Sequence, residues 1–252
     1  MKNIDFGIVA DIYDNYVNVD FDIPFYKSLC KNYNGGVLEL MCGTGRVSQP
    51  LLEDGIDVTC VDYSQEMLDV FSRKLTGRKA SLICQDVSKL DLGRKFEFIF
   101  IPFHSFSEII DRETRRQAMG RIIEHLEEDG DLLITLYNPV YRLKLADGSM
   151  KLLGKYELPH DRTLVVTYYN TLGTISNLVC GMQFYEIYND KNELMEKRFL
   201  DIAFSLVSKD EIVDLCNEFG LSIKKVYGDY NFGEFNEKSR FMNYVLTRQR
   251  HS

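Results

Sequence analysis

Short apolar runs alternate with helical patterns over the first three-fifths of the chain. The runs are of strand length, rich in β-branched and aromatic residues, and recur about every 20–35 residues. They cover residues 37–40, 58–61, 80–84, 96–101 and 132–136. Strands that alternate with helices through short turns predict right-handed crossovers and a parallel, doubly wound α/β sheet.

Two helical stripes between these runs carry boundary signals. Ser64 is placed to cap the first helix, and Gly130 is expected to end the second. The apolar positions of the first stripe are Met67, Leu68, Phe71 and Leu75, and those of the second are Met119, Ile122, Ile123 and Leu126. Because each set repeats at helical spacing, each predicts an amphipathic helix.

The pattern changes after Pro139. Residues 141–160 are mixed and predict a loop. Long alternating strands are expected beyond it, at residues 164–169, 178–188 and 197–206. Turn residues separate these strands, so the segment predicts an antiparallel β-meander.

The first pattern returns after the meander. Ser208 and Glu211 form a capping box, and Gly220 ends the helix that they begin. The last two strands are expected at residues 221–227 and 241–247. The predicted fold class is therefore α/β, with a doubly wound, seven-stranded Rossmann-like sheet whose last strand is antiparallel, and with an inserted antiparallel β-meander.

Composition narrows the class of protein. The 252 residues hold 30 Lys and Arg against 38 Asp and Glu, a net charge of −8, and 45% of them are hydrophobic. This apolar content excludes wholesale disorder, and the acidity argues against a nucleic-acid partner, because phosphate binding requires basic side chains. The longest uncharged run, Thr163 to Tyr185, is too polar to span a membrane, so no membrane partner is expected.

The cysteines and the N-terminus indicate the compartment. The six cysteines are irregularly spaced and include no Cys-x-x-Cys pair, so neither a metal site nor a disulfide framework is expected. Acidic residues interrupt the start of the chain before any apolar stretch forms, which argues against a signal peptide. Both observations favour a cytoplasmic location.

The segment from Val37 to Ser48 is the most informative in the chain, because a strand runs into a glycine loop that opens a helix. Ligands of open parallel sheets bind at the carboxyl ends of strands, where a helix N-terminus offers free N–H groups. Gly43 and Gly45 allow the backbone to approach such a ligand. The alternative is a plain, tight strand–helix turn.

Acids at the following strand ends favour a nucleoside site. Asp62 ends the second strand, where it can accept ribose hydroxyls, and Asp86 ends the third, beside the expected adenine. A turn or cap role is the alternative for each. Ser48 replaces the third glycine of a dinucleotide loop, and Glu39 would repel a pyrophosphate but support an ammonium group. The loop therefore favours a zwitterionic ligand over a diphosphate.

With these motifs the chain resembles the class I S-adenosylmethionine-dependent methyltransferases, over residues 35–250. The resemblance rests on residues 39–45 (ELMCGTG), 61–64 (VDYS), 85–87 (QDV) and 101–105 (IPFHS). Met41 stands where the family usually has glycine. The inserted meander resembles the small-molecule branch, such as aminosugar N-methyltransferases.

The resemblance implies S-adenosylmethionine as the cofactor. Glu39 and the glycine loop would hold its methionine end, Asp62 its ribose and Asp86 its adenine amine. Arg46 would either meet the cofactor carboxylate or be a solvent-exposed arginine. The full set of expected cofactor-binding residues is Tyr16, Glu39, Met41, Cys42, Gly43, Thr44, Gly45, Arg46, Asp62, Tyr63, Met67, Gln85, Asp86, Val87 and Phe103.

The resemblance also implies a division of labour along the chain. The expected parts are an N-terminal helical lid segment at 1–34, a cofactor-binding α/β domain at 35–140 and 207–252, and an inserted substrate-side β subdomain at 141–206. The tyrosine-dense N-terminal segment either covers a sheet edge or closes over the site, with Tyr13 or Tyr16 at the methionine end. The chain is expected to be a monomer or a homodimer.

The expected activity is methyl transfer to an oxygen or nitrogen of a small-molecule acceptor. The leaving thioether needs no acid, so positioning and water exclusion can supply much of the catalysis. His104 is the candidate general base, and the alternative is a histidine that only packs in its loop.

Two other functions remain open at this point, a nicotinamide-dependent oxidoreductase and a non-catalytic S-adenosylmethionine-binding protein. A DNA amino-methyltransferase is disfavoured, because the loop after the fourth strand lacks the Asn/Asp-Pro-Pro-Tyr/Phe motif that grips a flipped base. An open cavity under the meander would favour catalysis, whereas a cavity filled by the aromatic side chains of residues 164–188 would favour a binding protein.

Overall fold

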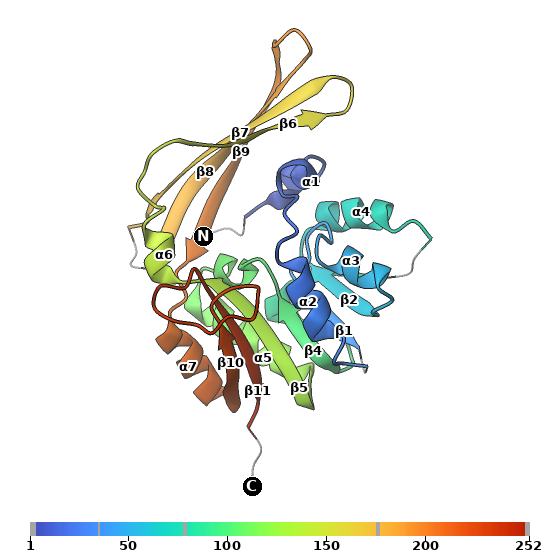
Figure 1. Ribbon diagram of the computed structural model, residues 1–252, viewed down its shortest axis with the longest axis vertical. Helices are drawn as coiled ribbons and strands as arrows, with labels where there is room; N and C mark the ends of the chain where they lie inside the picture. Colours follow the sequence, from blue (N-terminus) through green and yellow to red (C-terminus); the bar gives the residue numbers. More distant parts are fainter. Residues whose placement is uncertain (1–3, 35, 78–79, 175–176, 250–252) are drawn as a thin grey trace.

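The computed structural model describes residues 4–34, 36–77, 80–174 and 177–249. Its larger sheet has seven strands in the order β10-β11-β5-β4-β1-β2-β3 (Figure 1). These strands are β1 Val37–Leu40, β2 Val58–Asp62, β3 Ser81–Cys84, β4 Phe96–Ile101, β5 Leu126–Tyr137, β10 Leu221–Tyr227 and β11 Phe241–Arg248. The first five are parallel, and β11 runs antiparallel to β5 and β10. The predicted fold class is confirmed.

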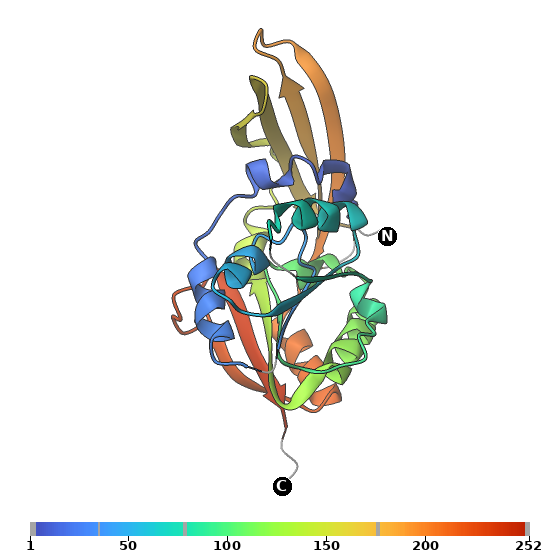
Figure 2. The same cartoon turned by 90° about the vertical axis from the view of Figure 1, so that its right-hand side faces the viewer.

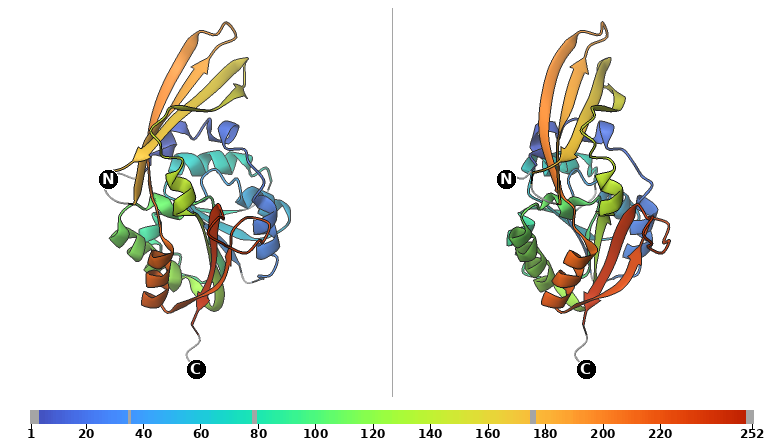
Figure 3. Two further views of the ribbon diagram at one scale, coloured as in Figure 1. Left: turned by 60° about the vertical axis from the view of Figure 1, so that its left-hand side comes forward. Right: turned by 90° about the vertical axis from the view of Figure 1, so that its left-hand side faces the viewer.

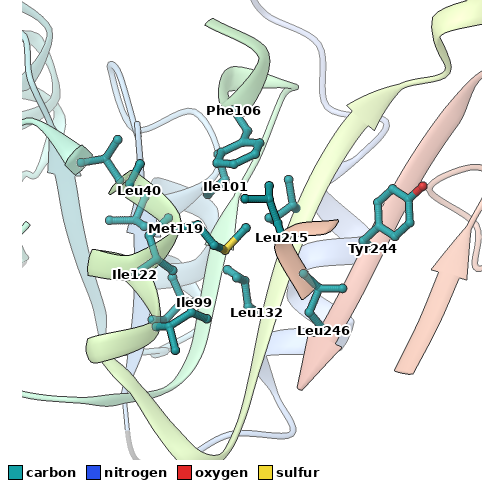
Figure 4. Close-up of a cluster of buried hydrophobic side chains, with 14 of the residues drawn as sticks. Leu40, Ile99, Ile101, Phe106, Met119, Ile122, Leu132, Leu215, Tyr244 and Leu246 are labelled. Carbon is teal, nitrogen blue, oxygen red and sulfur yellow. The ribbon is translucent and has the colours of Figure 1, made fainter. Parts of the chain in front are cut away.

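Helices cover both faces of this sheet, as a doubly wound fold requires. On one face lie α2 Ile23–Cys30, α3 Ser48–Glu53 and α4 Gln65–Lys74, and on the other lie α5 Arg112–Glu124 and α7 Lys209–Glu218. Successive side chains of a strand point to opposite faces of the sheet, so a single strand contributes to the cores on both faces. In β4, Phe98 and Phe100 pack under the first group of helices, whereas Ile99 and Ile101 pack against α5 and α7 (Figure 4).

The predicted helix caps can be compared directly with the structure. The Ser64 hydroxyl accepts a hydrogen bond from the Met67 amide at 3.3 Å, which confirms the first cap. The Ser208 hydroxyl likewise accepts from the Glu211 amide at 3.2 Å. The reciprocal half of that capping box is absent in the described structure, because the Glu211 carboxylate pairs with Arg115 at 2.7 Å.

Gly130 does not end a helix, so that prediction was wrong. Helix α5 ends at Glu124, and β5 begins at Leu126, which places Gly130 inside the strand. The pairing of β5 with β4 shifts register at this point. A Cβ at Gly130 would lie 3.0 Å from the Glu97 carbonyl oxygen, so glycine here permits close approach of the two strands.

The inserted segment forms a four-stranded antiparallel sheet that projects from one end of the α/β body (Figures 1 and 3). Its strands are β6 Lys151–Leu158, β7 Arg162–Leu172, β8 Leu178–Tyr188 and β9 Leu194–Ser205, preceded by the short helix α6 Pro139–Leu143.

The expectation of a loop over residues 141–160 was therefore wrong. Strand β6 lies at the edge of the sheet, has a register shift at Gly154, and leaves Leu152 and Leu153 exposed. With no consistently buried face, it lacks the alternation by which a strand is recognised in sequence.

The N-terminal segment lies between the antiparallel sheet and α4 (Figure 2). It contains the 3₁₀ turn η1 Phe6–Val9 and the single-turn helix α1 Tyr13–Tyr16. Its apolar side chains complete a third core with β7, β8 and β9. No helix in the described ranges has the length and hydrophobicity needed to cross a membrane.

Candidate cofactor and acceptor sites

Two adjoining cavities lie at the carboxyl ends of the central strands and share Met41 as a common wall. One follows β2 and β3, and the other follows β1 and the glycine loop. Most of the side chains expected to bind a cofactor line one cavity or the other: Glu39, Met41, Cys42, Gly43, Thr44, Arg46, Asp62, Tyr63, Gln85, Asp86, Val87 and Phe103. The structure does not place the remaining three, Tyr16, Gly45 and Met67, in either cavity.

Asp62 joins the glycine loop to the end of β2. Its carboxylate accepts hydrogen bonds from the Gly43 amide at 2.7 Å and the Ser64 amide at 2.9 Å. Burial raises the pKa of Asp62, and these backbone hydrogen bonds oppose the rise. The loop geometry therefore depends on this one side chain, which also lines the first cavity.

Met41 stands where the resembled family usually has glycine, and its backbone conformation is one that favours glycine. Its φ is +59°, in the left-handed region where side chains other than glycine are strained. The strand–loop turn thus keeps the geometry of a glycine position while carrying a side chain. That side chain forms the wall between the two cavities.

Glu39 is the buried acid of the second cavity. It accepts a hydrogen bond from the Ser48 hydroxyl, and its residue is 1% exposed. Burial raises the pKa of Glu39 to about 8, against the opposing effects of Ser48 and the Arg46 guanidinium. A cationic ligand group in this cavity would favour the ionised form of Glu39.

Gly45 and Met67 pack beneath the loop and do not line either cavity. Gly45 has a φ of +77°, and a Cβ there would overlap the Phe71 ring. Met67 is buried, with its methyl carbon 3.3 Å from where a Gly43 Cβ would lie. Both residues fix how closely α4 approaches the loop.

Tyr13, and not Tyr16, is the N-terminal tyrosine in the second cavity. Tyr16 points to the antiparallel sheet, where its hydroxyl lies 3.0 Å from that of Tyr185. Asp14 links this segment to the cofactor loop, because it accepts from the Thr44 hydroxyl at 2.5 Å and pairs with Lys74 at 2.7 Å. The first three residues of the expected lid lie outside the described ranges.

Arg46 lies in the turn just before α3, and not inside the helix. Its guanidinium forms a bidentate pair with Asp22 at 2.6 and 2.7 Å and also donates to the Val19 carbonyl at 2.8 Å. The same guanidinium lies 4.6 Å from the centre of the Phe103 ring. It is therefore a half-buried, paired arginine in the cavity wall, which excludes the solvent-exposed alternative.

Asp86 both caps a turn and lines the first cavity. One of its oxygens accepts from the amide and the hydroxyl of Ser88, each at 2.8 Å, at the start of the turn η2 Val87–Lys89. The expected cap role and the cavity position therefore coexist, since the second oxygen has no hydrogen bond within the described structure.

A third and larger cavity, of about 430 Å³, opens beneath the antiparallel sheet. It shares Tyr13 and Phe103 with the second cavity and Glu108 with the first. Aromatic side chains from β7 and β8 do not fill it. We refer to it below as the acceptor cavity.

His104 lies in the wall of the acceptor cavity. Its ring is 3.8 Å from that of Tyr137 and 5.2 Å from that of Phe241, and its buried Nδ1 has no hydrogen-bond partner in the described structure. Phe103 and His104 both have positive φ values, of 53° and 67°, so the turn after β4 is strained. Burial, followed by the charge of Arg142, holds the pKa of His104 well below its usual value.

Glu108 is a site residue that the sequence did not reveal. It ends the 3₁₀ turn η3 Ser105–Glu108 and is shared by the first cavity and the acceptor cavity. Burial raises the pKa of Glu108 to about 8, and the charge of Asp62 adds to the rise. A turn of four residues has no periodicity, so nothing in the sequence pattern distinguished Glu108 from a surface acid.

The donor chemistry fits S-adenosylmethionine. Carboxylates at the ends of β1, β2 and β3 face a connected space, and the glycine loop offers its backbone beside them. Buried acids suit a ligand that carries ammonium and sulfonium charges, and they disfavour a diphosphate. Within the described ranges, no three His, Cys, Asp or Glu side chains converge to hold a metal ion.

Comparisons with known proteins agree with this site. A family model described as a methyltransferase domain matches residues 37–130. The cypemycin N-terminal methyltransferase of a Streptomyces species is 27% identical over 213 residues, which cover 84% of this chain and 83% of that protein.

Solved structures show the same fold at low identity. An S-adenosylmethionine-dependent methyltransferase from Clostridium acetobutylicum ATCC 824 aligns with a TM-score of 0.79 at 22% identity, over 97% of this chain and 99% of that one. The sugar N-methyltransferase KedS8 from Streptoalloteichus sp ATCC 53650 aligns with a TM-score of 0.76 at 19% identity, over 95% and 92% of the two chains.

The motif order, the strand order and the methyltransferase-domain match over residues 37–130 together support a class I S-adenosylmethionine-dependent methyltransferase. The methyltransferase relatives indicate an enzyme, and S-adenosylmethionine is its expected cofactor. The alternatives of a nicotinamide-dependent oxidoreductase and of a non-catalytic binding protein are set aside accordingly.

Proposed function

We propose that the enzyme methylates a nitrogen or oxygen of a small-molecule acceptor bound in the acceptor cavity. One observation carries the proposal. The cavity of about 430 Å³ meets the two cofactor cavities at shared walls formed by Tyr13, Phe103 and Glu108. An acceptor there would have a direct line to the methyl group, which an in-line displacement requires.

The cofactor would lie along the strand ends. Glu39 and the Gly43 backbone would hold its methionine end, Asp62 its ribose and Asp86 its adenine amine. When bound, the cofactor supplies an electrophilic methyl group. The chain's own residues then position the acceptor and exclude water, with the rings of Tyr13 and Phe103 closing the junction between the cavities.

Two side chains are placed to take a proton from the acceptor. A general base works best when its pKa lies near the operating pH. Glu108, with a pKa raised to about 8 by burial, meets this condition better than His104, whose pKa burial lowers well below 6.5. We therefore assign the base role to Glu108, and to His104 the role of an aromatic wall with one free nitrogen.

A nitrogen acceptor is favoured over oxygen. Of the relatives described above, KedS8 is named as a sugar N-methyltransferase, and the cypemycin enzyme is named as an N-terminal methyltransferase. An amine that binds as an ammonium ion would be attracted to an acid at the junction, and it must lose a proton before attack. Glu108 can serve both steps.

The test has a binding arm and a turnover arm. Calorimetry should show binding of S-adenosylhomocysteine and none of NADH. A screen of small amines, amino acids, sugars and phenols, scored by release of S-adenosylhomocysteine, should find turnover among the amines. Asp57→Ala, at an exposed site, is a control that should match wild type. Binding of NADH in place of S-adenosylhomocysteine, or turnover confined to phenols, would contradict the proposal.

A further inference from the structure

We propose that Arg142 and Arg240 form an oxyanion subsite in the acceptor cavity, so that the natural acceptor carries a carboxylate or a phosphate as well as the methylated atom. The inference rests on the proposed function, because it concerns the same cavity. It identifies one chemical property of the acceptor that the fold alone leaves open.

The two guanidinium groups come from segments far apart in the sequence. Arg142 lies in the last turn of α6, and Arg240 lies just before β11. Asn138, the cap of α6, donates its amide to the Arg240 carbonyl at 2.9 Å and its side-chain amide to the Ser239 carbonyl at 2.9 Å. These bonds hold the loop before β11 against α6, and both arginines line the acceptor cavity.

Neither arginine has an acidic partner in the part of the chain that the structure describes. Their guanidinium groups make no hydrogen bond or ion pair with a carboxylate there, and both lie over the Tyr137 ring, at 5.0 Å for Arg142 and 5.7 Å for Arg240. Burial lowers the pKa of Arg142, and the charge of Arg240 lowers it further. Two positive charges over one ring repel each other, so an anion bound between them would reduce this electrostatic repulsion.

Three other arginines differ from Arg142 and Arg240, because each has a carboxylate partner. Arg46 is paired with Asp22, Arg115 with Glu211 and Arg198 with Asp11. In each case a carboxylate offsets the cost of removing the charge from water. Arg142 is half-buried and has no such partner, so it is a feature that calls for a ligand, and the exposed Arg240 adds a second positive charge beside it.

Polar atoms in the same cavity also lack partners. The buried Asn170 Oδ1 and His104 Nδ1 have no hydrogen bond in the described structure. Both residues line the acceptor cavity with the two arginines. These two residues therefore make the wall of the cavity partly polar, which suits a polar ligand better than a purely apolar one.

The charges also give the acceptor a direction. Among the described residues, Glu108 is the one acid that lines the acceptor cavity, and it lies at the junction with the cofactor. The arginines lie over the Tyr137 ring, which contacts the ring of His104, and the junction with the second cavity is formed by Phe103 and Tyr13. An acceptor with an oxyanion at Arg142 and Arg240 and an amine toward Glu108 would match both ends.

Anion binding can be tested without knowledge of the acceptor. The protein saturated with S-adenosylhomocysteine is titrated with sodium phosphate, and separately with sodium acetate, at constant ionic strength. We expect saturable binding of at least one anion, at least tenfold weaker in Arg142→Gln and in Arg240→Gln. Lys144→Gln, which changes an exposed charge on the turn that follows α6, should match wild type. Phosphate alone binding assigns a phosphate site, and acetate alone a carboxylate site.

Selectivity gives a second readout. Each amine that is turned over is compared with a partner that differs only in the anion, such as an amino acid with its amide, or an amino alcohol with its phosphate ester. The acid-bearing member should be preferred at least tenfold in kcat/KM, mainly through KM, and Arg142→Gln should remove the preference. Arg142→Lys keeps the charge and should restore part of it, which separates a charge effect from a folding defect.

Several results would overturn the inference. They are the absence of anion binding in wild type, equal anion binding in wild type and both glutamine variants, or a preference for the neutral acceptors. These outcomes are distinct from failure of the proposed function. That failure would appear as absent turnover with every amine, or as failure to bind S-adenosylhomocysteine, and the anion titration does not depend on turnover.

Discussion

The cofactor cavities and the acceptor cavity are built in opposite ways. The cofactor cavities use consecutive strand ends of one sheet, and their charged groups include the carboxylates of Glu39, Asp62 and Asp86. The acceptor cavity is assembled from the N-terminal segment, η3, α6, the antiparallel sheet and the loop before β11, and two of its three charged side chains are arginines. The acids of the cofactor cavities complement a cationic cofactor, and the arginines would complement the anionic group that we propose for the acceptor.

The largest expected effect lies at the boundary between the two. Glu108→Gln should lower kcat by about 100-fold, because a general base contributes roughly 10²–10⁴-fold to rate. Its affinity for S-adenosylhomocysteine should change less than tenfold, since the carboxyl is only one side chain of that cavity. Steady-state kinetics and calorimetry measure the two quantities.

His104→Gln is the matched control for this experiment, because His104 lines the same cavity. We expect its kcat to fall by less than tenfold. A larger loss at His104 than at Glu108 would return the base role to the histidine.

Asp62→Ala should act on the cofactor side alone. It removes an acceptor of two backbone N–H groups and the expected ribose partner. We expect S-adenosylhomocysteine to bind about 10–100-fold more weakly, and the free energy of unfolding to fall by about 1–3 kcal/mol. Anion binding in the acceptor cavity should be retained in the folded variant. Loss of both kinds of binding would mean that the two cavities are not separable, and Asp57→Ala again provides the surface control.

The pH dependence of cofactor binding tests the acid in the second cavity. Below its raised pKa of about 8, Glu39 is mostly protonated in the free protein, and a cationic ligand requires the ionised form. The affinity for S-adenosylhomocysteine should therefore increase as pH rises from 6 to 8, by at most about tenfold per pH unit. Glu39→Gln should bind weakly with a flat profile. A wild-type profile that is already flat would mean that Glu39 is not coupled to the ligand charge.

The same group changes stability in the opposite direction. In the ligand-free protein the folded state keeps the Glu39 proton up to about pH 8, whereas the unfolded state loses it near pH 4.3. The free energy of unfolding should therefore fall as pH rises between these values, by at most about 1.4 kcal/mol per pH unit. Urea denaturation at several pH values measures this fall in the free energy of unfolding. The fall should be smaller in Glu39→Gln than in wild type.

The smallest expected effect concerns the residue shared by the cofactor cavities. Met41→Gly removes a left-handed conformation that costs about 1–2 kcal/mol, but it also removes packing, so we expect a net change within about 1 kcal/mol. Met41→Val keeps a side chain and adds β-branching, which should cost at least about 1 kcal/mol more than glycine. Denaturation curves compare the two. Equal stability would show that the backbone at this position relaxes without cost.

The cofactor half of the molecule was predictable because its signals are local. A strand end, a glycine and an acid occur within a few residues of one another, and parallel strands bring those local groups to one edge. The cap at Ser64 and the acid at Asp62 were identified in this way. The error at Gly130 followed from strand packing that the local pattern does not report, because this glycine lies inside β5 against the Glu97 carbonyl.

The acceptor half was less predictable because it depends on contacts between distant segments. Arg142 and Arg240 are about 100 positions apart, and only the tertiary fold places both over Tyr137. The edge strand β6 lacks a buried face, and η3 is too short to have a period. Of the two tyrosines expected at the methionine end, Tyr13 lines the second cavity, whereas Tyr16, one helical turn further on, contacts Tyr185.

The helix α1 connects the cofactor side of the site to the acceptor side. Within four residues, Asp14 is tied to Thr44 and Lys74 on the cofactor side, and Tyr16 is tied to Tyr185 on the acceptor side. If spent cofactor leaves past this turn, the aspartate bonds must break, and a rigid single turn would carry the tyrosine with it. The enzyme would therefore open both chambers in one movement, and the frequency of that movement would set an upper limit on turnover.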